Sequence, residues 1–160
     1  MPYSTVASTV AQAADELSEV LATIPTRLGR VTEAEASLPR RPGAWSKKEI
    51  LGHLLDSAAN NHHRFVRAQI ENSLAMPGYE QNGWVAIQQY RSRSWVDLIV
   101  FWTLYNRHLL HLMETALSES LSRPCRIGTG EEVTLEFLMI DYVAHLNHHL
   151  AQLLDSSTAR

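Results

Sequence analysis

The segment SKKEILGHLLDSAANNHHRFVRAQIE, residues 46–71, decides the fold class because its apolar residues recur at helical rather than alternating spacing. It opens with a capping box, in which the Ser46 hydroxyl and the Glu49 carboxylate each satisfy a backbone N–H at the start of a helix. The apolar positions that follow are Ile50, Leu51, Leu54, Leu55, Phe65 and Val66. The segment therefore predicts an amphipathic helix that ends near Glu71.

Three other segments show the same period. The first is expected to form a helix from about Ser4 to Ile24, where Pro25 follows. Another runs from Ser94, which opens a second capping box, to about Leu117, and the last from about Thr134 to Leu154. Between the second and third long helices, residues 72–83 hold turn residues and predict a long loop, with a short helix at Trp84–Tyr90.

Four amphipathic helices in 160 residues pack most simply as an all-α four-helix bundle, here expected as a single domain over residues 1–160. The long connection between the second and third helices permits a topology other than plain up-down-up-down. No segment alternates convincingly between apolar and polar residues. A two-stranded hairpin between Arg123 and Val133 is an open alternative to the loop that we expect there.

Composition excludes several classes of protein. Fourteen Lys and Arg against seventeen Asp and Glu leave a net charge of −3, which gives no basic surplus for nucleic acid. The longest purely apolar run, Leu98–Trp102, is far shorter than the roughly 20 residues of a membrane span. The single cysteine, Cys125, permits no internal disulfide and is expected in a loop. We expect a cytoplasmic protein whose partners include neither nucleic acid nor membrane.

Histidines are the candidate chemical groups, since the chain contains eight of them. His145 and His149 lie four residues apart, on one face of the last helix, where two imidazoles can chelate one metal ion. Three neutral imidazoles and a water make the open site of a catalytic zinc. His53 is the best third candidate, since it follows Gly52, a helical glycine that suggests close approach of a neighbour or a ligand.

Other histidines compete for this role. His108 and His111, three residues apart, form the rival pair, and His148 could replace its neighbour at position 149. His62 lies about 180° around the helix from His53, so these two cannot share one ion, and His63 fares little better. The metalloprotease motif is excluded because Leu146 stands where it needs a glutamate.

Several motifs together resemble the DinB superfamily, and particularly its YfiT-like branch. They are RPGAWS at 41–46, GHLLDS at 52–57, RF at 64–65, PGYE at 77–80 before Trp84, and YVAHLNHHLA at 142–151. The similarity extends from about Arg41 to Leu153. The branch often has a further histidine shortly after its last ligand, where this sequence has Gln152.

This resemblance implies a four-helix bundle that binds one divalent metal ion through His53, His145 and His149. It also implies a metal-dependent enzyme with a small-molecule substrate, either a hydrolase or a transferase that attaches a low-molecular-weight thiol such as bacillithiol or mycothiol to an electrophile. Imidazole ligands accept several metals, and we expect zinc or nickel. A homodimer is expected. The alternative is a bundle that binds metal or a small ligand, or dimerises, without catalysis.

Further residues are expected around such a site. Asp56 and Asp141 lie at helical spacing from the histidines and could accept their outward N–H groups. Trp45, Arg64 and Tyr142 are expected to line the pocket, where a cation and an aromatic wall would suit an anionic thiol.

Overall fold

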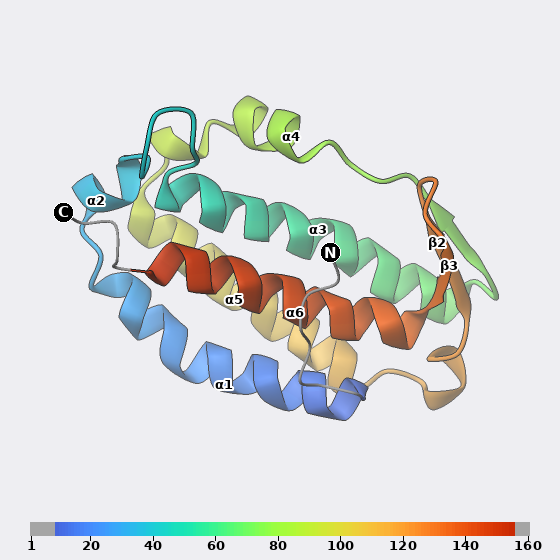
Figure 1. The fold of residues 1–160 in the computed structure, drawn as a ribbon. Coiled ribbons are helices and arrows are strands. Elements are labelled where there is room, and N and C mark those ends of the chain that lie inside the picture. Colours follow the sequence, from blue (N-terminus) through green and yellow to red (C-terminus); the bar gives the residue numbers. More distant parts are fainter. Residues whose placement is uncertain (1–8, 156–160) are drawn as a thin grey trace.

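Four long helices form a bundle in the computed structural model, which describes residues 9–155 (Figure 1). These are α1 (Val10–Gly29), α3 (Lys47–Ile70), α5 (Trp95–Glu114) and α6 (Leu135–Leu154). Helices α1 and α3 each pack against both α5 and α6, which closes the four helices around a common core. The four-helix bundle predicted from the sequence is confirmed.

The connection between α3 and α5 is long because it returns along the bundle. It contains β1 (Leu74–Met76), α4 (Gln81–Gln88) and the short 3-10 helix η1 (Tyr90–Ser92), and it passes over α3 so that α3 and α5 run in the same direction (Figure 1). The shorter elements α2 (Glu33–Ser37) and η2 (Ser118–Ser120) lie in the other two connections. The topology therefore differs from plain up-down-up-down, as the long connection allowed.

The first helix differs from its predicted bounds. It starts at Val10, where Thr9 caps it by accepting a hydrogen bond from the Gln12 N–H, while residues 4–8 of the predicted helix lie outside the described residues. The helix also continues through Pro25 to Gly29. Proline removes one backbone hydrogen bond, but burial of Leu28 against the core keeps the last turn helical.

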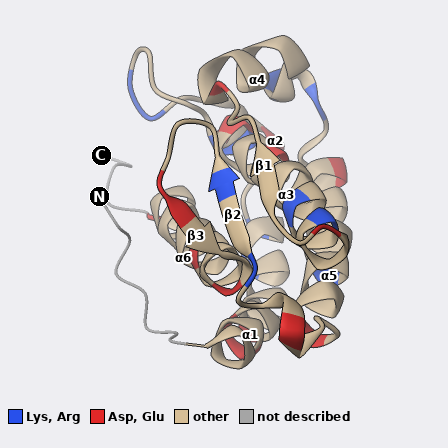
Figure 2. Cartoon of the chain, turned by 90° about the vertical axis from the view of Figure 1, so that its right-hand side faces the viewer, with Lys and Arg blue, Asp and Glu red and all other residues tan. Residues whose placement is uncertain are grey.

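A small sheet closes one end of the bundle, which corrects two expectations. Strands β2 (Pro124–Ile127) and β3 (Glu132–Thr134) form the antiparallel hairpin that the sequence analysis gave as an alternative to a loop. Strand β1 lies within residues 72–83, where we expected a loop, and pairs in parallel with β2. Figure 2 shows a basic segment of β2 beside an acidic segment of β3, consistent with the 3.8 Å ion pair between Arg126 and Glu132.

Cys125 therefore lies in a strand and not in a loop. Its side chain is buried, and burial raises the pKa of the thiol. The negative charge of Glu132 raises this pKa further, by a smaller amount. The nearby arginines do not activate it. Among the described residues, no helix is both long and apolar enough to cross a membrane.

Candidate metal centre

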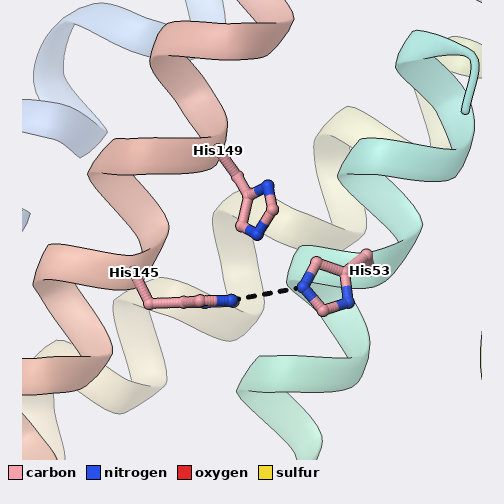
Figure 3. A group of neighbouring side chains, drawn as sticks. All are labelled: His53, His145 and His149. Atoms are coloured by element: carbon pink, nitrogen blue, oxygen red, sulfur yellow. Dashed lines mark hydrogen bonds between the residues drawn. The ribbon is translucent and has the colours of Figure 1, made fainter. Parts of the chain in front are cut away.

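Three histidines from two helices converge inside the bundle (Figure 3). His53 comes from α3, and His145 and His149 come from successive turns of α6. Each offers one ring nitrogen, and the three nitrogens lie within 4.8 Å of one another. The Nε2 atoms of His53 and His145 are 3.2 Å apart. This spacing of donor atoms is compatible with one metal ion between them.

The start of α3 positions His53. The capping box at Ser46 is formed as predicted. One turn further on, the helix backbone packs closely against the connection that carries Tyr90. A Cβ atom at Gly52 would collide with the Tyr90 ring. The close approach expected from this glycine is confirmed, and the neighbour is a side chain of the same protein.

Burial keeps the three imidazoles uncharged. It lowers the pKa of His53 to about 4, with the His149 ring as the second cause. It lowers the pKa of His145 to about 3, with smaller effects from the other histidines. The pKa of His149 is also lowered by burial, although its hydrogen bond with Gln152 acts in the opposite direction. Neutral rings have free lone pairs, so this donor set fits a divalent cation.

Gln152 orients His149 in a way that sequence reasoning missed. The Nδ1 of His149 lies 3.0 Å from the Oε1 of Gln152, so an N–H at Nδ1 donates to that oxygen and leaves Nε2 free as a ligand atom. In the sequence, Gln152 stands out only as a departure from the family pattern. Its spacing of three residues from His149 on one helix could have indicated this contact.

Asp56 has a different role from the one expected. Its Oδ1 accepts hydrogen bonds from the Tyr90 hydroxyl at 2.5 Å and from the Gln88 amide at 2.7 Å. Its Oδ2 and the Nδ1 of His53 are both buried without a hydrogen-bond partner, so the expected contact between them is not made. Asp56 instead anchors the connection that lies over α3.

The remaining predicted residues surround the centre. The Trp45 ring packs on His53 with ring centroids 5.1 Å apart, and the Tyr142 hydroxyl donates to Asn106 Oδ1 at 2.6 Å. Arg64 and Asp141 line a cavity of about 260 Å³ that His145 also lines. Sequence reasoning did not assign the other lining residues Ser57, Asn61, Gly78, Tyr79, Gln81 and Leu138.

The competing histidines lie elsewhere. His62 contacts His108 and Tyr105 between α3 and α5, with 5.0 Å between the two imidazole centroids. His108 and His111 are 6.4 Å apart by the same measure. His148 is exposed, while its neighbour His149 faces His53. Among the described residues, the three converging histidines are the one set of three that could hold a metal ion.

Comparisons with known proteins agree with this geometry. A family model described as the DinB superfamily matches residues 11–153. The "Putative metal-dependent hydrolase YfiT" of Bacillus subtilis is 24% identical over 148 residues, which cover 89% of this chain and 83% of that protein. The "Putative metal-dependent hydrolase BLi00869/BLi00870/BL03027" of Bacillus licheniformis is 30% identical over 129 residues, which cover 77% of this chain and 70% of that protein.

The solved structure of YfiT from Bacillus subtilis shares the fold. It superposes with a TM-score of 0.76 at 23% identity, covering 96% of this chain and 89% of that chain. That protein is described as a probable metal-dependent hydrolase with an unusual four-helix bundle topology.

Proposed function

This chain belongs to the DinB superfamily, and we propose that it is an enzyme that uses a divalent metal ion, held by His53, His145 and His149, to transform a small molecule. The observation that carries the proposal is the convergence of three uncharged imidazoles beside a cavity. Zinc or nickel suits such a ligand set. The names of the relatives, which describe metal-dependent hydrolases, support it.

The chemistry divides between the ion and the chain. A divalent cation held by three neutral ligands would keep its full charge, and it would lower the pKa of a bound water or thiol enough to supply a nucleophile near neutral pH. The protein keeps the rings neutral by burial and holds His149 through Gln152. The cavity beside His145 provides room for the substrate.

Hydrolysis is the reaction that the relatives' names favour. A second candidate is transfer of a low-molecular-weight thiol, such as bacillithiol, to an electrophile. Leu146 occupies the place where metalloproteases carry a glutamate base. A thiol loses its proton far more readily than water, so it needs less help from such a base.

Metal analysis and a substrate panel test the proposal. We expect tag-free protein to contain one metal ion per chain, and His149→Ala to lose it while its circular dichroism stays unchanged. His111→Ala, at an exposed histidine of α5, is the matched control and should keep the metal. The panel has two parts. Ester and amide substrates test hydrolysis, and bacillithiol, mycothiol, glutathione and cysteine, each with an electrophile, test thiol transfer. Wild-type protein without stoichiometric metal would favour the non-catalytic alternative.

We further propose a homodimer that forms through α5. The side chains of Val96, Val100, Phe101 and Leu104 are each at least half exposed on this helix, and an apolar face of this kind is typical of an interaction surface. A single domain and a cytoplasmic location stay predictions. The second rests on the lone, buried Cys125.

A further inference from the structure

The cavity beside His145 has a size and a lining that restrict its ligand. One wall is a face of α3, another is a face of α6, and the connection through Gly78, Tyr79 and Gln81 contributes the rest. Its volume of about 260 Å³ lies just below the roughly 300–1,000 Å³ that is typical of sites for drug-sized ligands. The ligand is therefore a compact molecule.

Arg64 is the one lysine or arginine among the described residues that line this cavity. Its Nε atom is buried and has no hydrogen-bond partner, and its Nη1 reaches Asn61 Oδ1 only at 3.5 Å. Burial lowers the pKa of this guanidinium, while Tyr79 and the charge of Asp141 act in the opposite direction. A planar guanidinium with free N–H groups is well suited to a carboxylate.

Asp141 lines the same cavity from α6. Burial raises the pKa of its carboxyl, and the charge of Arg64 partly offsets this effect. None of the ion pairs within 4.0 Å among the described residues joins Asp141 to Arg64. The cavity therefore holds two half-buried groups of opposite charge that influence each other electrostatically but form no ion pair within 4.0 Å. A ligand with one charge would stabilise one group and leave the other unpaired, which is costly in a buried site.

We propose that this cavity binds a small molecule that carries both a carboxylate and an ammonium group, as an α-amino acid does. The carboxylate accepts hydrogen bonds from Arg64, and the ammonium donates to Asp141. Arg64 and Asp141 thus determine which substrates bind. This proposal rests on the proposed function in one respect: the part of the ligand that bears neither charge lies towards the metal centre, because His145 lines both the cavity and that centre.

Three probes of matched shape separate the two charges. L-norvaline carries both groups, pentanoate lacks the ammonium, and butylamine lacks the carboxylate. Titration calorimetry on the metal-loaded protein should show norvaline binding at least tenfold more tightly than either analogue, because each charged hydrogen-bonded contact contributes about tenfold or more.

Variants assign the preference to the two residues. Arg64→Gln should reduce the affinity for norvaline to that for butylamine, and Asp141→Asn should reduce it to that for pentanoate. Arg67→Gln is the matched control, because this arginine lies on the same helix but pairs with Glu71 outside the cavity. Its affinities should equal those of the wild type.

A free amino acid can also chelate a metal ion, so His149→Ala is titrated as well. It should lose the metal and keep the preference for norvaline, since neither recognising residue is a proposed ligand. The inference is overturned by any of three results: no binding of norvaline, a preference that survives in Arg64→Gln, or a preference that disappears with the metal. Wild-type protein that lacks metal but keeps the preference would overturn the proposed function alone.

Discussion

His53, His145 and His149 are neutral at pH 7 because the protein around them removes water from the rings. This desolvation has a cost, since an imidazole free in solution would accept a proton below about pH 6.5. The same residues that prepare the site for a cation therefore make the metal-free protein sensitive to acid.

Metal-free protein should lose stability as the pH falls from 6.5 towards 4. The pKa of His53 drops from 6.5 to about 4 on folding. In this window the unfolded chain binds a proton that the folded chain does not, so the free energy of unfolding decreases with acid. The full shift of His53 is worth roughly 3 kcal/mol.

Urea denaturation of EDTA-treated protein between pH 7 and pH 4 measures this loss. His53→Asn removes one titrating ring and should flatten the dependence, whereas His111→Asn, at an exposed histidine, should leave it as in the wild type. A free energy of unfolding that stays constant over this range would contradict the prediction.

Gln152→Ala should weaken metal binding by about tenfold, because the variant lacks the oxygen that orients His149. This is the lower end of the range for residues that orient a metal ligand, and we expect it because Gln152 is exposed. Gln152→Glu keeps an oxygen acceptor for His149 and should retain the affinity. Competition with a chromophoric chelator measures both. The prediction fails if the alanine variant binds metal as tightly as the wild type.

At the scale of elements, the contact of α3 with η1 places the first histidine. Gly52 permits the Tyr90 ring to lie directly against the helix backbone, one residue before His53. Tyr90 in turn donates to Asp56 on the next turn of α3. The long connection is thus held to the helix that carries His53 by one steric contact and one hydrogen bond.

Gly52→Ala should destabilise the protein by up to about 2 kcal/mol. Overpacking against Tyr90 costs about 1–3 kcal/mol, while the higher helix propensity of alanine returns about 1 kcal/mol. Urea denaturation measures the difference, and the double variant with Tyr90→Ala should lose less stability than the two single variants lose together. Gly29→Ala is the control, since nothing lies within 4 Å of the added Cβ, and it should not destabilise. Equal effects of the two alanines would refute the steric account.

At the scale of the whole molecule, α5 buries one face against α1 and α3 and leaves another apolar face exposed. Val100 and Leu104 lie one turn apart on that face and are 51% and 56% exposed, respectively. A second copy of the chain would remove these side chains from water.

Light scattering after size exclusion tests the proposed dimer. The wild type should have twice the mass of one chain, and Val100→Lys combined with Leu104→Lys should have the mass of one. Ile87→Lys, at an exposed apolar residue of α4, is the matched control and should remain dimeric. A monomeric wild type, or a double variant that stays dimeric, would exclude this interface.

Local pattern was sufficient for the long helices, because the apolar period and the capping residues act within a few residues of chain. The shared face of His145 and His149 followed from spacing alone, whereas His53 could be joined to them only through the family resemblance. His53 and His145 are 92 positions apart, and no local rule relates two helices across that separation.

Tertiary contacts decided the rest. Leu74 pairs with Cys125 in a parallel ladder, so β1 exists only where the end of α3 meets the hairpin. The helix continues through Pro25 because Leu28 finds a buried position. The neutral state of the histidines also comes from burial, and the cavity that Arg64 and Asp141 line forms only where α3 and α6 meet. The sequence by itself determines which face each helix presents, but desolvation and pairing depend on distant segments that only the folded chain brings together.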